Sequence, residues 1–347
     1  IIGDGLTALT LAKNLVNKKI NICFYHKNRI KNITSSRTIG ISKNNFNFLR
    51  TEVHKIPKKL FWAIKKIEIY SEKLEKEKLL KFENDKNNLF YMVKNHELYT
   101  SLINELSKNR FFTKKKIRNK LFYENFQKNN KYDLIINCDS NNFLSEKFFT
   151  KKIDKNYENV AYTAILKHKK IKNDVAIQIF TKNGPIAFLP ISKSQTSVDI
   201  LNLINKNNPK YQIQKTLKLN NFRLYSSNLR NYHHKNILAF GDLLHRIHPL
   251  AGQGFNMTIR DIKILSLIIQ NRIELGLQLD ESVFSEFEKK TKNKNFLFSK
   301  SIDFIYEVFN FDKKIKSKSF DNILKNIGKN SKLTNYFIKL ADKGINF

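Results

Sequence analysis

The first sixteen residues, IIGDGLTALTLAKNLV, constrain the fold more than any other part of the sequence. The end of an apolar strand is followed by a turn at Gly3 and Gly5 and then by an apolar stretch with helical periodicity. The spacing up to Ala8 fits G-x-G-x-x-G/A, a turn whose backbone approaches a pyrophosphate at a helix N-terminus. A second strand, NICFYH at 21–26, follows as a βαβ unit requires. We therefore predict a parallel α/β sheet with a dinucleotide site at Gly3, Gly5 and Ala8; an ordinary βα turn is the alternative.

One part of such a site is missing. The second strand of the unit normally ends in an acidic residue that binds the adenosine ribose, and His26 stands there instead. An imidazole also forms hydrogen bonds with hydroxyl groups. His26 is therefore the candidate for the ribose contact.

The periodicity of the apolar residues changes along the chain. A helical pattern at 95–108 and a strand at 132–138 continue the α/β unit. Between 157 and 200 the period is two residues, and Lys182-Asn183-Gly184 supplies a hairpin turn. A buried strand, NILAF at 236–240, precedes a remainder with helical patterns. We predict a discontinuous α/β domain over 1–150 and 230–300, an inserted antiparallel β domain over 151–229 and a helical region over 301–347.

Composition limits the partners and the compartment. The net charge of +34 comes mainly from Lys spread along the whole chain, whereas nucleic-acid readout favours Arg. We therefore expect no nucleic-acid partner, and a basic surface suits anionic lipid better. No apolar run is long enough to cross a membrane. Cys23 and Cys138 lie in short apolar runs and favour a reducing, cytoplasmic compartment. Because the chain starts inside a strand, we expect it to be a fragment that lacks a few N-terminal residues.

A second glycine-rich stretch, GDLLHRIHPLAGQGFNMTIRD at 241–261, holds three of the ten glycines. Asp242 follows a buried strand, where a carboxylate accepts hydrogen bonds from ligand hydroxyls. Pro249 precedes the Gly252–Gly254 segment, and a helical pattern starts at Phe255. Bare N–H groups at a helix N-terminus stabilise negative charge, such as that on the edge of a reduced flavin.

This stretch resembles the flavin-contacting GD motif, GDAAH…HP…GQG.N…..D, of FAD-dependent aromatic hydroxylases, and most closely that of the ubiquinone-biosynthesis hydroxylases. The matching residues are Gly241, Asp242, His245, His248, Pro249, Gly252, Gln253, Gly254, Asn256 and Asp261. Three more segments resemble the same subfamily: SSRTIGIS, LFYMVKNHEL and IFTKNGPIAFLPI. The resemblance implies a Rossmann-like FAD-binding domain with an inserted antiparallel β substrate domain, as in p-hydroxybenzoate hydroxylase, and a helical C-terminal region.

The resemblance also implies a reaction, in which a flavin hydroperoxide hydroxylates the ring of a polyprenylated phenol. FAD is the implied cofactor, dioxygen the cosubstrate, and NAD(P)H or a redox protein the electron donor. Catalytic positions at the flavin edge and ring face are expected at Pro249, Gly252, Gln253 and Gly254. We expect cofactor contacts also from Arg37, Asp139, Gly241, Asp242, Phe255 and Asn256, and ring-binding groups at Phe188 and Pro190.

One family motif is altered. The pattern D-L-V-V-G-A-D-G-x-x-S-x-V-R appears here as DLIINCDSNNFLSE. Asp139 matches, but Ser140, Phe143 and Glu146 stand where Gly, Ser and Arg are expected. The family uses this motif for the FAD pyrophosphate and for the nicotinamide cofactor. We therefore expect slow direct reduction by NAD(P)H.

Several alternatives remain open from the sequence. A non-catalytic FAD-binding scaffold of a quinone-biosynthesis assembly is the second hypothesis for function. Asp242, His245 and His248 could suggest a metal, but Pro249 argues against a helix across them, and we expect hydrogen-bonding roles for both His and no metal. The tail at 298–329 mixes Phe and Ile with Lys, which predicts a packed helix or a helix on a membrane. An isoprenoid substrate favours peripheral contact with the inner membrane and with other quinone-biosynthesis proteins.

Overall fold

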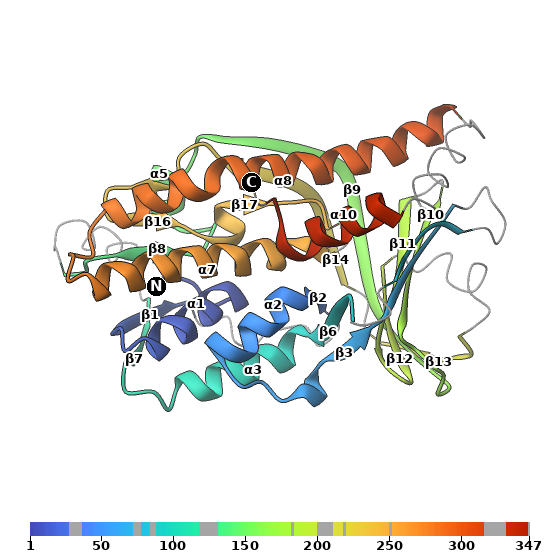
Figure 1. Cartoon of the computed structure of the whole chain (residues 1–347), viewed down its shortest axis with the longest axis horizontal. Helices are drawn as coiled ribbons and strands as arrows, with labels where there is room; N and C mark the ends of the chain where they lie inside the picture. Colours follow the sequence, from blue (N-terminus) through green and yellow to red (C-terminus); the bar gives the residue numbers. More distant parts are fainter. Residues whose placement is uncertain are drawn as a thin grey trace.

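The structure is a computed structural model that describes residues 1–27, 37–71, 78–83, 88–117, 131–181, 184–199, 211–217, 220–249, 252–315 and 331–345. An α/β part that contains the N-terminus lies at one end, and a large β-sheet lies at the other (Figure 1). The long strand β9 (Lys152–His168) runs from one part into the other.

A parallel sheet organises the α/β part. Ile2 is its central position, because it bridges in parallel to Tyr25 of β1 (Ile22–His26) on one side and to Asn137 of β8 (Ile135–Asn137) on the other. β7 (Phe112–Lys116) extends the sheet beyond β1, and β16 (Ile237–Ala239) extends it beyond β8, both in parallel. The short β15 (His233–His234) pairs antiparallel at the edge. The predicted βαβ unit and the predicted strands at 21–26, 132–138 and 236–240 are confirmed.

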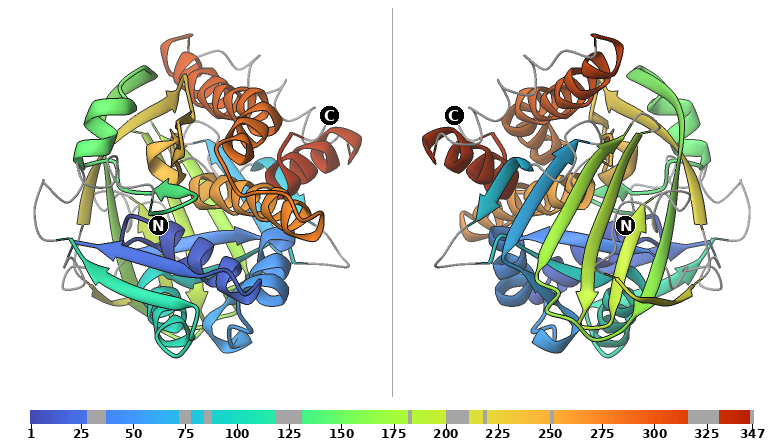
Figure 2. Two further views of the ribbon diagram at one scale, coloured as in Figure 1. Left: turned by 90° about the vertical axis from the view of Figure 1, so that its left-hand side faces the viewer. Right: turned by 90° about the vertical axis from the view of Figure 1, so that its right-hand side faces the viewer.

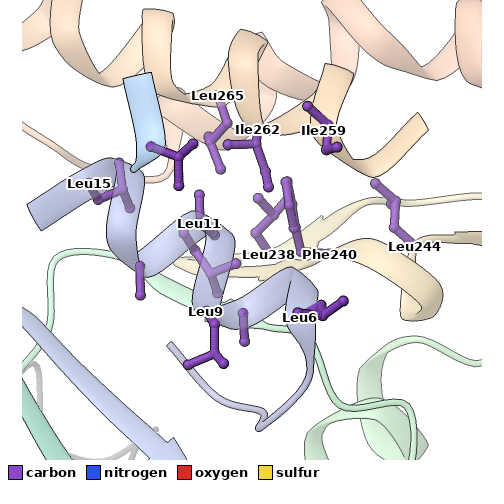
Figure 3. Close-up of a cluster of buried hydrophobic side chains, with 14 of the residues drawn as sticks. Leu6, Leu9, Leu11, Leu15, Leu238, Phe240, Leu244, Ile259, Ile262 and Leu265 are labelled. Carbon is purple, nitrogen blue, oxygen red and sulfur yellow. The ribbon is translucent and has the colours of Figure 1, made fainter. Parts of the chain in front are cut away.

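Helices pack on this sheet through their apolar faces. α1 (Leu6–Asn17) packs against the sheet and against α7 (Gln253–Glu274), and leucines of α1 meet Leu238, Phe240, Ile259 and Ile262 in one core (Figure 3). α3 (Asn95–Leu106), within the predicted helical pattern at 95–108, packs against α1 and buries Leu98, Leu102 and Leu106. Because α1 packs against the sheet, α3 and α7, ten of its twelve residues are buried.

Within the described ranges, nine strands form the large sheet (Figure 2). Its main path is β17-β14-β9-β12-β11-β10-β4-β5, and β13 also pairs with β9. The bounds beyond β9 are β4 (Lys66–Ser71), β5 (Lys78–Glu83), β10 (Val175–Thr181), β11 (Gly184–Ser192), β12 (Gln195–Asp199), β13 (Ile213–Thr216), β14 (Asn220–Leu229) and β17 (His245–Arg246). The predicted antiparallel strands at 157–200 are therefore present.

The predicted domain ranges do not coincide with the sheets. β4 and β5 come from the first range, yet β4 pairs in parallel with β10 of the large sheet. Such pairing is long-range, and the local pattern at 66–71 gives no sign of it. A smaller sheet of β2 (Thr38–Ser42), β6 (Phe90–Lys94) and β3 (Trp62–Ile64) packs between the two parts through Ile64, Met92 and Ala176.

Long helices form the C-terminal region, and short ones link the strands. α8 (Ser282–Ile315) packs against α7, and α10 (Ser331–Lys343) contacts α2 (Lys43–Phe48). Phe298, Ile302 and Tyr306 of α8 are buried, so this part of the tail is a packed helix, as one of the two alternatives predicts. The remaining short helices are α5 (Phe143–Phe148), η2 (Leu49–Val53), η3 (Lys58–Leu60) and η4 (Gly241–Leu243). In the described part of the chain, no helix is both long and apolar enough to span a bilayer.

Candidate functional site

The carboxyl ends of the parallel strands bring the predicted motifs to one edge of the sheet. The backbone leaves the sheet at Gly3, at Lys27, at Cys138 and at Phe240, each directly after a strand or bridge. Ligands of open α/β sheets bind at this edge. The edge therefore unites the first glycine turn, the altered middle motif and the start of the 241–261 stretch.

The two glycines of the first turn have different functions. Gly3 has a φ of +129°, and a Cβ there would lie 3.1 Å from the Cβ of Cys138, so this glycine allows close packing. Gly5 is the N-cap of α1 and has a φ of −89°, and a Cβ there would have nothing within 4 Å. Open space thus lies before the N-terminus of α1, as a pyrophosphate requires. Ala8 is fully buried in the helix–sheet contact.

Charged groups meet across this edge. The ammonium group of Lys27 lies 2.8 Å from a carboxylate oxygen of Asp139 and donates to the carbonyl of Asn141 at 2.5 Å. Burial raises the pKa of Cys138 to about 12, and the carboxylates of Asp139 and Asp242 add to the increase. Asp242 therefore lies near Cys138, and it is exposed, which leaves its oxygens accessible to a ligand.

The altered middle motif forms an ordered loop. Asn142 caps α5 by accepting from the backbone N–H of Ser145 at 3.0 Å, and its amide donates to Asn137 at 2.8 Å. The Ser145 hydroxyl donates to the carbonyl of Asp139 at 2.6 Å. Asn137, Asn142 and Ser145 therefore hold Asp139 in place without the family's Gly and Arg, and Glu146 is exposed. This network was not predicted, and the Asn–x–x–Ser capping spacing is its local sign in the sequence.

The glycines of the 241–261 stretch also differ in function. Gly241 has a φ of +65°, and a Cβ there would lie only 2.6 Å from Cγ2 of Thr7 on α1. Gly252 has a φ of +62° and is the N-cap of α7. A Cβ on Gly254 would have nothing within 4 Å. The stretch therefore packs closely on α1 at its start and leaves open space beside the N-terminus of α7.

Asn256 joins α7 to β2. Its amide donates to the carbonyl of Gly40 at 2.8 Å, and its oxygen accepts from the backbone N–H of Ser42 at 2.9 Å and from the Asn45 amide at 3.1 Å. The side chain of Asn256, which was expected to contact the flavin, thus forms its hydrogen bonds with other groups of the protein. Its contribution to a cofactor site is to fix the start of α7 beside β2, which follows the exposed Arg37.

The remaining residues of the stretch lie as follows. The Gln253 side chain is buried, and its Oε1 has no hydrogen-bond partner among the described residues. Phe255 is partly buried against the main core, and Pro249 is exposed. Gln253 therefore presents an unused acceptor at the N-terminus of α7.

The two His of the stretch are structural. His245 is hydrogen-bonded to Asp261, whose other oxygen accepts from Asn295 of α8 at 3.0 Å, and all three are buried. The hydrogen-bonding role predicted for His245 is confirmed. His248 is buried against the rings of Tyr157 and Tyr306, with centroids 4.7 and 4.3 Å away. Within the ranges that the structure describes, no cluster of His, Cys, Asp or Glu could hold a metal ion.

The buried imidazole of His248 predicts a pH dependence of stability. Burial lowers its pKa from about 6.5 to about 4. Between these values the unfolded chain binds a proton that the folded chain does not, so the free energy of unfolding falls as the pH falls from 6.5 to 4. His248→Phe, which keeps a ring against the two tyrosines, should flatten this dependence in denaturant titrations at pH 7, 6 and 5. Equal pH slopes for both proteins would contradict the prediction.

The structure does not bring Phe188 and Pro190 to the side of the large sheet that faces α7. Phe188 is fully buried and stacks on Tyr211 at 5.7 Å in a separate core. Phe180 of β10 packs with Ile247 and Met257 of the 241–261 stretch, and its register partner is Pro185. Because side chains alternate along a strand, Pro185, Ala187 and Leu189 share that face, and Phe188 and Pro190 point away. Phe188 and Pro190 therefore lie on the other face of β11 from Phe180, and their contact with a substrate ring stays a prediction.

Comparisons with known proteins agree with this geometry. No family model matches the chain. The chain has the fold of p-nitrophenol 4-monooxygenase PnpA from Pseudomonas putida DLL-E4, with a TM-score of 0.76 at 10% identity over 98% of this chain and 97% of that one. HpxO of Klebsiella pneumoniae, complexed with FAD and uric acid, gives 0.72 at 12% identity over 98% and 95%. The fold is therefore that of the FAD-dependent aromatic monooxygenases.

The relatives found by sequence belong to a narrower functional class than the structural neighbours. The mitochondrial ubiquinone biosynthesis monooxygenase COQ6 of Dictyostelium discoideum is 26% identical over 44% of this chain and 34% of its own length. The 3-demethoxyubiquinol 3-hydroxylase of Escherichia coli (strain K12) is 28% identical over 39% of this chain and 40% of its own length. These matches confirm the resemblance to the ubiquinone-biosynthesis hydroxylases. The aligned part spans less than half the length of each of these relatives.

Proposed function

We propose that this protein is an FAD-dependent monooxygenase that hydroxylates the aromatic ring of a polyprenylated phenol in ubiquinone biosynthesis. One observation carries the proposal: the N-termini of α1 and α7 have open space at Gly5 and Gly254, and the 241–261 stretch that leads into α7 packs closely on Thr7 of α1 at Gly241. One N-terminus suits a pyrophosphate and the other suits the anionic edge of a flavin.

The residues present fit FAD. The Gly3–Gly5 turn would hold the pyrophosphate, and Asp139 and Asp242 would accept from hydroxyls. The backbone of Gly252–Gly254 and the unpartnered Oε1 of Gln253 would face the ring, with Arg37 and Pro249 beside it. Bound FAD would supply the activation of dioxygen, while the protein binds, orients and excludes water. For the substrate ring, Ala187 and Leu189 replace Phe188 and Pro190 as candidates, because they face the α7 side.

The substrate class determines the proposed surroundings. A phenol with an isoprenoid tail partitions into lipid, so we propose peripheral contact with the inner membrane from the cytoplasmic side and contact with other quinone-biosynthesis proteins. The high net positive charge suits anionic lipid. Electrons come from NAD(P)H or a redox protein, and dioxygen is the cosubstrate.

Dioxygen uptake tests the proposal. The purified protein should be yellow with bound FAD and should consume dioxygen when given a phenolic quinone precursor and a reductant. Expression in hydroxylase-deficient bacteria should restore the quinone, and the accumulated intermediates would identify the ring carbon. A yellow protein that neither consumes dioxygen nor restores the quinone would indicate the non-catalytic scaffold instead.

Asp242 should contribute directly to cofactor affinity. If its carboxylate accepts a hydrogen bond from a ribityl hydroxyl, Asp242→Ala should weaken FAD binding by about 1.5–3 kcal/mol, the usual value for a hydrogen bond to a charged group. Flavin fluorescence titration measures the dissociation constant, and Asp242→Asn, which keeps an acceptor, should retain part of the affinity. An unchanged constant for Asp242→Ala would assign this residue a purely structural role.

Electron delivery should depend on the altered middle motif. Glu146 adds a negative charge where the family has a positive one, and like charge disfavours an anionic nicotinamide cofactor. We expect slow flavin bleaching by NADH or NADPH in anaerobic stopped-flow experiments, and faster bleaching with a redox protein. Ser140→Gly combined with Glu146→Arg should accelerate the nicotinamide reaction. Fast, saturable bleaching of the wild-type protein would refute this expectation.

A further inference from the structure

Two polar atoms without partners lie at the edge of the parallel sheet. The His26 side chain is at the end of β1 and is only 8% exposed, and its Nδ1 has no hydrogen-bond partner among the described residues. The Oδ2 atom of Asp4, between the two glycines of the first turn, is also buried without such a partner. An unsatisfied buried polar atom costs about 1–3 kcal/mol, so native proteins contain few. A ligand that supplies both partners would explain them.

The two side chains belong to neighbouring strand ends. The backbone N–H of Gly3 donates to the carbonyl of Tyr25 at 2.9 Å, so Asp4 and His26 each follow directly after this bond. Burial and the nearby Lys114 lower the pKa of His26, and the Asp4 carboxylate opposes the change. The same carboxylate adds to the effect of burial in raising the pKa of Tyr99 on α3. The Asp4 carboxylate therefore influences the protonation of both His26 and Tyr99.

The charges around the pair define the ligand chemistry. Lys27 already binds Asp139 and the carbonyl of Asn141. Lys114 and Lys116 lie on β7, next to β1, where Lys116 is the register partner of His26. Burial and the charges of Lys114 and Lys116 lower the pKa of His26 and so favour a neutral imidazole. A carboxylate and a neutral imidazole at neighbouring strand ends suit two adjacent hydroxyl groups, of which the carboxylate is the stronger acceptor.

We propose that Asp4 and His26 together bind the ribose hydroxyls of the adenosine half of the dinucleotide. Asp4 thereby supplies the carboxylate that the end of β1 lacks, from the adjacent strand and within the glycine turn itself. The inference rests on the proposed function only in requiring an ADP-containing dinucleotide as the ligand. It assigns to Asp4 a function that the glycine pattern does not indicate.

Binding of ADP and its deoxy analogues to the full-length protein, by calorimetry, tests the assignment. ADP should bind the wild-type protein about tenfold more tightly than 2′-deoxy-ADP or 3′-deoxy-ADP. In Asp4→Asn and in His26→Phe the affinity for ADP should fall, and the preference over at least one deoxy analogue should approach one. His26→Gln, which keeps a hydrogen-bonding group, should retain part of the preference. Asp154→Asn and His234→Phe are matched controls away from this edge and should keep the wild-type ratios.

Several results would overturn the inference. Tighter binding of ADP by Asp4→Asn would mean that the carboxylate faces the phosphates and repels them. Equal affinities of the wild-type protein for ADP and both deoxy analogues would show that no ribose hydroxyl is recognised. A wild-type protein that binds neither ADP nor FAD would refute the proposed function itself. Because each preference is a ratio measured on one folded protein, loss of folding cannot imitate it.

Discussion

Replacing Gly5 with Asp is expected to abolish FAD binding. Gly5 is the N-cap of α1 and faces open space, where we place the cofactor pyrophosphate. An aspartate there would bring a carboxylate against two phosphate charges and fill the space that the backbone leaves. The purified variant should be colourless, and fluorescence titration should detect no saturable binding. A yellow, FAD-loaded Gly5→Asp protein would refute the assignment of this turn.

The same variant should fold normally, which makes the result interpretable. Gly5 has a φ of −89° and a Cβ there meets no atom within 4 Å, so an aspartate fits without strain. Asp is a favoured N-cap residue and interacts well with the helix dipole. The thermal midpoint of the FAD-free variant should therefore equal or exceed that of the FAD-free wild type. Gly5→Asn, of equal size without the charge, separates repulsion from bulk and should bind FAD more tightly than Gly5→Asp.

Local sequence patterns predict the parallel sheet well but not the pairing of distant segments. The G-x-G turn, the strand at 21–26 and the buried strand at 236–240 are each visible in a few consecutive residues, because apolar runs and glycines determine them. The pairing of β4 with β10 joins residues more than a hundred positions apart. No periodicity within either segment indicates that register.

In the candidate site, too, features set by a few consecutive residues are predictable and features set by distant contacts are not. The positions of Gly3, Gly5 and Gly252 follow from turn chemistry, and the strand holding Phe188 follows from its motif. The face to which Phe188 points depends on where β11 meets its neighbours, and a shift of one residue reverses it. The network of Asn137, Asn142 and Ser145 also cannot be predicted from the sequence. The Asn137 amide donates to the Ser145 hydroxyl and the Asn142 amide donates to Asn137, and these contacts form only when the loop folds.

Gly241→Ala should cause the largest loss of stability among the glycine variants. At a φ of +65° a Cβ would lie 2.6 Å from Cγ2 of Thr7. The left-handed conformation costs an alanine about 1–2 kcal/mol, and overpacking in a buried contact adds about 1–3 kcal/mol. We expect the free energy of unfolding, measured with denaturant, to fall by about 2–5 kcal/mol, and FAD affinity to fall as well, because the contact positions Asp242 against α1.

Gly276 provides a matched control for this prediction. Its φ is +67°, but a Cβ there would have nothing within 4 Å. In Gly276→Ala only the backbone conformation is unfavourable, so the free energy of unfolding should fall by about 1–2 kcal/mol. Adding Thr7→Ala to Gly241→Ala removes the clashing methyl and should recover most of the steric part, whereas Thr7→Ala alone should have a smaller effect. Equal losses of unfolding free energy for Gly241→Ala and Gly276→Ala would contradict the prediction. The contact with Thr7 would then not be the reason for a glycine at position 241. The hydrogen bonds of Asn256 to β2 would be the remaining contacts that position the start of α7.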